Sequence, residues 1–189
     1  MSKPPYRPET ARAAAPPAAA SPRRSVGDRI ATTLATSGGI GLAPKAPGTF
    51  GSLPGLAVGA GLHQAALRGA AALEAPAWAA PLAILGGLLA LLLLAWWSIA
   101  RTERLWNTHD DQRIVIDEVV GQAIAVGFFT PSWLTLVAGF ALFRLFDITK
   151  PLAIGWIDRE APGALGTLFD DVLAGLVAAL LLAGIVRFV

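Results

Sequence analysis

The chain has 189 residues, of which 54% are hydrophobic and only 15% are charged, and its mean hydropathy is +0.59. These values exclude an ordinary water-soluble globule and favour an integral membrane protein of about one domain. Because the chain contains no Cys, cysteine nucleophiles, disulfide scaffolds and cysteine-bound metal sites are excluded as well.

The first segment, residues 1 to 27, is rich in Ala, Pro, Ser and Arg and shows no apolar periodicity, so we expect a disordered tail before a helical domain at 28 to 189. The first 29 residues carry a net charge of +4, and the remaining 160 carry −2. Nucleic-acid binding would need basic and aromatic side chains together on a folded face. The tail offers one Tyr, so we expect no nucleic-acid partner and interpret the tail as a basic arm facing the membrane.

A Gly- and Pro-rich segment, GGIGLAPKAPGTFGS, follows at 38 to 52. Its glycines would let backbone amides approach an anion, and Thr49 or Ser52, at the start of a helix beginning near Leu53, would place that anion at a helix N-terminus. The residue order is not that of a nucleotide P-loop. The segment is therefore either a phosphate site, with Lys45 as a cation, or a turn-rich entry to a membrane helix.

Long apolar runs occupy most of the remaining chain. Residues 81 to 100 carry no charge over 20 positions and end near two Trp residues, which is typical of a transmembrane helix. The runs at 53 to 67 and 172 to 186 are shorter, and each is expected to cross the membrane or lie deep in it. The sequence thus predicts an all-α, compact, multi-pass helical membrane protein.

The uncharged stretch 119 to 143 has two interpretations. It could form one tilted span, or two shorter helices broken at Thr130-Pro131-Ser132, because proline in a helix interior removes a hydrogen bond and clashes with the preceding turn. One span would put the polar residues on its two sides on opposite membrane faces. A hairpin would keep them together, and its arms would be re-entrant or packed within protein.

Most acids outside the tail lie in two polar blocks, at 101 to 118 and 144 to 171, and each block ends in a carboxylate pair: Asp117-Glu118 and Asp170-Asp171. Each pair stands at the expected start of an apolar helix, and a Gly three or four residues later allows close helix packing. We therefore expect these two helices to meet near their polar ends. Alternatively, the acids favour the positive ends of the helix dipoles.

Convergent carboxylates repel one another unless a cation lies between them. Hard oxygen ligands without Cys, and with only two His, favour Mg²⁺ or Mn²⁺ over zinc or copper. The sequence therefore predicts a carboxylate-bound divalent ion, with Lys45 and Arg144 nearby to neutralise a phosphate.

Four blocks together resemble the phosphatidylglycerophosphatase A family: GIGLAPKAPGTFGS at 39 to 52, IVIDEVVG at 114 to 121, FRLFDITKP at 143 to 151 and GALGTLFDDVLAG at 163 to 175. The resemblance implies a compact helical array that uses Mg²⁺ to remove the terminal phosphate of phosphatidylglycerophosphate. It implies that functional residues lie in these blocks, with the Gly48-Thr49 and Gly51-Ser52 turn nearby.

We combine this resemblance with the residue chemistry in one hypothesis for the site. Asp117, Glu118, Asp147 and Asp171 are expected to be catalytic. The expected metal ligands are Asp117, Glu118, Asp147, Asp170 and Asp171. The expected substrate-binding residues are Lys45, Gly48, Thr49, Ser52, Arg144 and Lys150.

The hypothesis also places the protein. We expect a multi-pass protein of the bacterial inner membrane whose active site faces the cytoplasm, because Arg101, Arg104, Arg144 and Lys150 would lie on the side of the basic tail. The lipid bilayer and phosphatidylglycerophosphate are its expected partners. A different class of function, a small membrane carrier that moves cations through its carboxylates, is the alternative, and it would place the acids in the middle of the spans.

Overall fold

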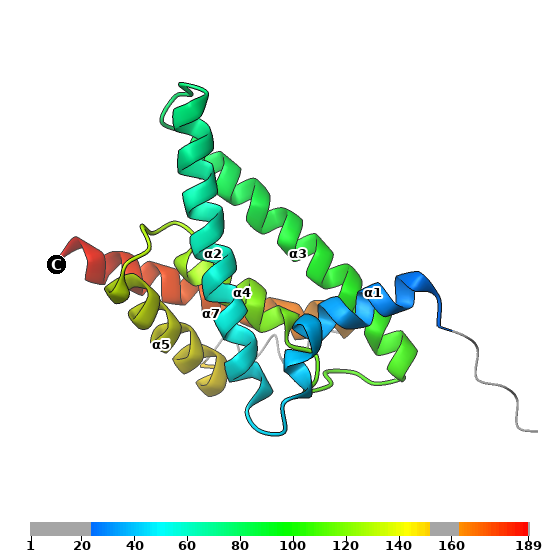
Figure 1. Ribbon diagram of the computed structural model, residues 1–189. Coiled ribbons are helices and arrows are strands. Elements are labelled where there is room, and N and C mark those ends of the chain that lie inside the picture. Colours follow the sequence, from blue (N-terminus) through cyan, green and yellow to red (C-terminus); the bar gives the residue numbers. More distant parts are fainter. Residues whose placement is uncertain (1–23, 152–162, 189) are drawn as a thin grey trace, which may run out of the picture.

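The computed structural model describes residues 24 to 151 and 163 to 188, and all regular structure in these ranges is helical, as predicted. Figure 1 shows α2 and α3 meeting at a turn and diverging from it, with α4 between them and α7 passing behind. The elements are α1 (Val26–Ala35), the 3-10 helix η1 (Ser37–Leu42), α2 (Pro47–Ala72), α3 (Ala79–Trp106), α4 (Ile116–Val126), α5 (Trp133–Thr149) and α7 (Gly163–Arg187).

Helix α1 begins at Val26, two residues before the expected domain boundary at 28. Its start is fixed by a reciprocal cap, in which the Ser25 hydroxyl accepts from Asp28 N and the Asp28 carboxylate accepts from Ser25 N. Arg101 of α3 binds the same carboxylate at 2.6 Å. The hydrogen bond from the Ser25 amide, and then the one from Arg101, lower the pKa of Asp28. Through its contact with Arg101, this carboxylate links α1 to α3. The disorder expected for residues 1 to 27 does not extend to Val26 and Gly27, which belong to α1, and residues 1 to 23 lie outside the described residues.

Helix α2 contacts α4 through a row of glycines spaced four residues apart. A Cβ atom added to Gly51, Gly55 or Gly59 would lie 2.6 to 2.7 Å from a side-chain atom of α4 or of Val115, the residue just before it. The two helices therefore touch almost backbone to backbone, since no side chain separates them at these positions. The consequence is that the N-terminal end of α2 lies beside the N-terminal end of α4.

Helix α4 crosses α7 at a pair of glycines, one on each helix, as the carboxylate–glycine spacing predicted. A Cβ atom on Gly175 would lie 2.3 Å from the Gly121 carbonyl oxygen, and one on Gly121 would lie 2.6 Å from the Asp171 carbonyl oxygen. Each glycine stands four residues after a carboxylate, Asp117 or Asp171. This crossing therefore brings the two acidic segments together.

The expected start of the last helix was wrong. Helix α7 begins at Gly163, so Asp170 and Asp171 lie two turns inside it. The start of α2 also differs from the expectation near Leu53, because Pro47 occupies the first turn and the helix includes both Thr49 and Ser52. In both cases a Gly-rich segment for which the sequence suggests a loop forms the first turns of the helix.

The stretch 119 to 143 forms two helices. Helix α4 ends at Val126, and Ser132 caps α5 by accepting from Thr135 N, while the Thr135 hydroxyl accepts from Ser132 N. Helix α5 then returns along α4, since Gly139 lies against Val126 and Phe143 lies against Gly121. This hairpin brings the C-terminal end of α5 back to the acids at the start of α4.

Within the described residues, α3 and α7 are long and apolar enough to cross a membrane. Helix α3 also exposes Leu82, Leu85, Leu89 and Leu93, each at more than half of its surface, which is an apolar face without a protein partner among the described helices. Residues 53 to 67, which we expected to cross the membrane or to lie deep in it, are part of α2, and α2 is not among the helices long and apolar enough to cross. The two long apolar helices favour association with a membrane.

Candidate functional site

Three carboxylates form the centre of the site. Asp117 and Glu118 stand in the first turn of α4 and Asp171 comes from α7, and one oxygen of each lies within 4.8 Å of the others. Asp117 and Asp171 are buried, and Glu118 is half-buried. Burial raises the pKa of Asp117 well above its usual range, and the adjacent Glu118 raises it further. Burial also raises the pKa of Glu118, so the cluster is costly unless a cation neutralises it.

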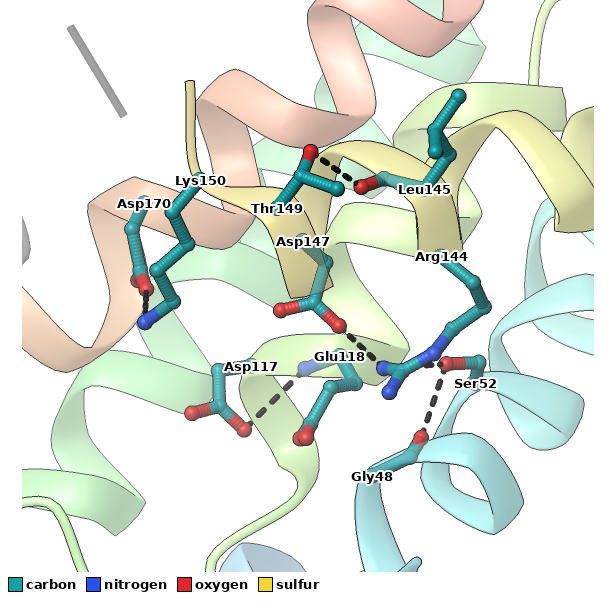
Figure 2. A network of polar contacts seen from close by, with 10 residues as sticks. All are labelled: Gly48, Ser52, Asp117, Glu118, Arg144, Leu145, Asp147, Thr149, Lys150 and Asp170. Atoms are coloured by element: carbon teal, nitrogen blue, oxygen red, sulfur yellow. Dashed lines mark hydrogen bonds and ion pairs between the residues drawn. The ribbon is translucent and has the colours of Figure 1, made fainter. Parts of the chain in front are cut away.

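A second layer comes from the end of α5. Arg144 donates to Asp147, three residues later on the same helix face, and also to Ser52 Oγ of α2 at 3.4 Å. The Ser52 hydroxyl in turn donates to the Gly48 carbonyl oxygen at 2.9 Å. Figure 2 shows Arg144 reaching from α5 to Ser52, beside the carboxylates of Asp117, Glu118 and Asp147. The guanidinium group is thus oriented by both helices.

A second cation, Lys150, stands at the end of α5. Its backbone adopts the left-handed conformation that ends the helix, with φ of 41°, and its Nζ lies 2.7 Å from Asp170 Oδ2 of α7. The left-handed turn directs Lys150 back toward the acids instead of continuing along the helix. Arg144 and Lys150 therefore lie at two sides of the carboxylate centre, each paired with an acid.

These groups line one cavity of about 390 Å³, a size suited to a small polar group. The expected residues that line it are Gly48, Asp117, Glu118, Arg144, Asp147, Lys150, Asp170 and Asp171. Thr49 is not among the lining residues, and Ser52 contributes from behind, through Arg144. Lys45 lines a neighbouring cavity instead. The structure thus assembles residues from four helices that are far apart in the sequence.

Some of the lining residues were not expected from the sequence. Asp110, Asp111 and Gln112 line the same cavity from the loop between α3 and α4. Glu103, which is 8% exposed, anchors this loop by accepting from Asp110 N at 3.1 Å and from the Thr167 hydroxyl of α7 at 3.2 Å. The sequence signal for Glu103 is its position near the end of an apolar helix. An acid there is buried only where it has hydrogen-bonding partners.

The residues fit a divalent cation by their chemistry. Three carboxylates offer hard oxygen ligands, the kind that Mg²⁺ and Mn²⁺ prefer. Glu118 Oε2 is buried and has no hydrogen-bond partner among the described residues. A buried carboxylate oxygen without a donor is costly, and a bound cation would remove that cost. The three carboxylates, with the cations Arg144 and Lys150 beside them, are suited to chemistry on an anionic group.

Gly48 offers a test of how closely the site is packed. A Cβ atom at this position would lie 2.1 Å from Glu118 Oε1 and 3.4 Å from Arg144 Nη1. We expect Gly48→Ala to displace the Glu118 carboxylate and to lower kcat about a hundredfold, since misplacing a catalytic group by about 1 Å has that effect. Phosphate release and thermal unfolding of the purified variant measure this.

The matched control is Gly61→Ala on the same helix, where an added Cβ meets nothing within 4 Å. It should unfold at the wild-type temperature or slightly above it, since Ala favours a helix interior, and it should keep wild-type activity. Equal activity in the two variants would show that Glu118 need not occupy its observed position.

The fold and the cavity define a helical protein with a buried carboxylate cluster that could hold a metal ion, and with two cations beside it. A family model described as Phosphatidylglycerophosphatase A matches residues 33–186, most of the chain. The chain belongs to the phosphatidylglycerophosphatase A family, as its four sequence blocks predicted. It is therefore a phosphoric monoester hydrolase, which favours the enzyme over the alternative of a cation carrier.

The relatives are similar over most of their length. A phosphatidylglycerophosphatase A of Escherichia coli K12 is 31% identical over 162 residues, 82% of this chain and 81% of the relative. One of Haemophilus influenzae is 34% identical over 159 residues, 80% and 86% of the two chains. A Bacteroides thetaiotaomicron protein, named as a candidate phosphatidylinositol-3-phosphatase, is 34% identical over 154 residues, 79% and 89% of the two chains. No solved structure matches.

Proposed function

We propose that the protein hydrolyses the terminal phosphate monoester of phosphatidylglycerophosphate at the membrane surface, with Mg²⁺, to give phosphatidylglycerol and phosphate. The observation that carries the proposal is the cluster of Asp117, Glu118 and Asp171 within 4.8 Å, in one cavity with Arg144 and Lys150. In the reaction a water oxygen forms a bond to phosphorus, the ester P–O bond breaks, and the alcohol oxygen leaves with a proton.

Asp117, Glu118 and Asp171 would hold Mg²⁺, with Asp147 and Asp170 as further ligands at the same cavity wall. When bound, the ion would polarise the phosphoryl group and lower the pKa of a bound water. Burial of Asp117 and Asp171 keeps bulk water away, so electrostatic interactions in the cavity are stronger than at an open surface. This low-dielectric setting favours the catalytic role of Asp117, Glu118, Asp147 and Asp171.

Arg144 and Lys150 would bind the non-bridging phosphate oxygens. In the described structure each is held by a carboxylate, Asp147 or Asp170, and a phosphate entering the cavity would share these cations. Ser52 orients the Arg144 guanidinium group, and Gly48 leaves room for Glu118. Thr49 stands in the first turn of α2, near the positive end of the helix dipole, and this position would favour a bound anion.

Phosphate release by the purified protein tests this function. We expect release from phosphatidylglycerophosphate in mixed micelles, no release after the divalent ions are removed with EDTA, and recovery when Mg²⁺ is added back. Phosphatidate, a lipid monoester with a different headgroup, serves as the comparison for selectivity. Equal release in EDTA and in Mg²⁺ would contradict the metal dependence, and release from phosphatidate alone would contradict the substrate.

We further propose that the site faces the cytoplasm of a bacterial inner membrane. Arg101 and Arg104 stand near the end of α3 that lies closest to the site, and Leu73 lies exposed at the opposite end, in the turn between α2 and α3. Because the chain has no Cys, single cysteines report without background. In spheroplasts an impermeant maleimide should label Leu73→Cys, and should label Thr108→Cys only after permeabilisation. The reverse pattern would overturn the orientation.

A further inference from the structure

A second cavity lies next to the catalytic one along the chain. It has a volume of about 640 Å³ and is lined by Gly39, Ile40, Leu42, Ala43, Pro44, Lys45 and Phe50. The next residues, Ala46 to Gly48, line the catalytic cavity. One short segment between η1 and α2 therefore forms a wall of both cavities, and we name the second one the loop groove.

The loop groove is apolar and open. Leu42 is 61% exposed and Phe50 is 50% exposed, so two large apolar side chains stand partly in solvent at the edge of an enzyme site. Their exposure costs about 25 cal/mol for each Å² of apolar surface in water. Exposed apolar side chains on a segment that also lines a catalytic cavity are suited to bind the non-reacting part of a substrate.

The backbone separates the polar and apolar sides of this segment. Ala46 adopts the left-handed conformation, with φ of 48° and ψ of 50°, immediately before Pro47 begins α2. This conformation is unfavourable for a residue with a Cβ atom, and it occurs where the chain passes from lining the loop groove to lining the catalytic cavity. On one side of Ala46, Lys45 lines the loop groove, and on the other side Gly48 lies against Glu118 in the catalytic cavity.

Lys45 is the cation of the loop groove. Its side chain is exposed, and no described residue forms an ion pair with its ammonium group. This contrasts with Arg144 and Lys150, each of which is paired with a carboxylate in the catalytic cavity. A lysine at the border between an acidic cavity and an apolar groove is suited to a phosphate that carries an apolar group.

We propose that the loop groove binds the phosphatidyl part of the lipid substrate, with Lys45 on its phosphodiester and with Leu42 and Phe50 against the start of an acyl chain. This inference rests on the proposed function, because phosphatidylglycerophosphate carries a phosphodiester and two acyl chains beyond its reacting monoester. The monoester enters the catalytic cavity, and the rest of the same molecule extends over residues 42 to 50. Lys45 thereby acts in substrate selection and does not touch the reacting phosphate.

Three substrates separate the contributions. The diacyl lipid has both the phosphodiester and the acyl chains, its deacylated form has only the phosphodiester, and glycerol 3-phosphate has neither. For Lys45→Gln we expect about a tenfold rise of KM for the first two relative to glycerol 3-phosphate, which corresponds to about 1.4 kcal/mol. For Leu42→Ser and Phe50→Ser we expect a similar rise for the diacyl lipid alone. In all three variants kcat on the lipid should change far less than KM.

Leu73→Ser is the matched control, because Leu73 is 80% exposed in the turn at the other end of α2. It should leave all three KM values at the wild-type level. If the soluble compounds are hydrolysed slowly, they are used as competitive inhibitors of lipid hydrolysis, and their inhibition constants replace KM. Leu42→Ser and Phe50→Ser are made separately, so that a folding defect in one leaves the other as a test.

The outcomes distinguish the two proposals. A wild-type protein that releases no phosphate from the lipid refutes the proposed function itself. A wild type that is active, with KM values for the lipid unchanged in Lys45→Gln, Leu42→Ser and Phe50→Ser, refutes the loop groove alone. Equal KM increases for the lipid and its deacylated form in Leu42→Ser would also contradict acyl-chain binding.

Discussion

Replacing Asp171 with Asn is expected to lower kcat for phosphate release by about a thousandfold or more. The substitution keeps the size of the side chain but removes the negative charge that completes the carboxylate cluster with Asp117 and Glu118. A bound metal contributes several kcal/mol of transition-state stabilisation, and each 1.36 kcal/mol corresponds to a factor of ten in rate. The variant should still insert into membranes, because removing one charge from a buried acidic cluster relieves repulsion. Steady-state phosphate release, with the amount of protein in the membrane fraction, measures both effects.

Asp117→Asn and Asp147→Asn should behave in the same way, because these residues line the same cavity. Glu74→Gln is the control: it removes an acid in the turn between α2 and α3, at the opposite end of α2, and should leave the rate unchanged. Near-normal rates in all three Asp variants would refute the catalytic assignment.

Replacing Gly175 with Val is expected to abolish measurable activity and to lower stability by about 1 to 3 kcal/mol, the usual cost of overpacking. An added Cβ would lie 2.3 Å from the Gly121 carbonyl oxygen, which is a backbone atom and cannot rotate away. Helices α4 and α7 would have to separate, and Asp117 and Asp171 would separate with them. Activity and thermal unfolding in detergent micelles measure the two effects.

Gly184→Val lies on the same helix and serves as its control, because an added Cβ meets nothing within 4 Å there. Both variants place the same β-branched residue in α7, so the difference between them isolates the helix crossing. A Gly175→Val protein that is as active as Gly184→Val would mean that the close approach of α4 to α7 does not position the site.

The helical class and the meeting of α4 with α7 could be predicted from the sequence, because apolar length and the carboxylate–glycine spacing are local signals. The start of α7 could not, since Gly163 and Gly166 suggest a loop and only tertiary packing keeps that segment helical. The break at 127 to 132 stayed ambiguous for a related reason. Hydrophobic periodicity alone does not distinguish one long apolar helix from two that pack on each other.

The candidate site was predicted in composition better than in arrangement. The residues of the carboxylate centre could be named because each lies in a distinctive sequence block. Lys45 lines a different cavity from Arg144, and the sequence offers no signal for this separation or for the left-handed conformation of the next residue, Ala46. The burial of Glu103 likewise depends on Asp110 and Thr167, which approach it from a loop and from another helix.

Binding of Mn²⁺, followed by electron paramagnetic resonance, tests most directly whether carboxylates from separate helices hold one divalent ion. Mn²⁺ prefers the same oxygen ligands as Mg²⁺ and loses its free-ion signal when bound. We predict saturable binding to the wild-type protein, competition by Mg²⁺, and a large loss of affinity in Asp171→Asn but not in Glu74→Gln. Wild-type affinity in Asp171→Asn, or no binding to the wild type, would contradict the account.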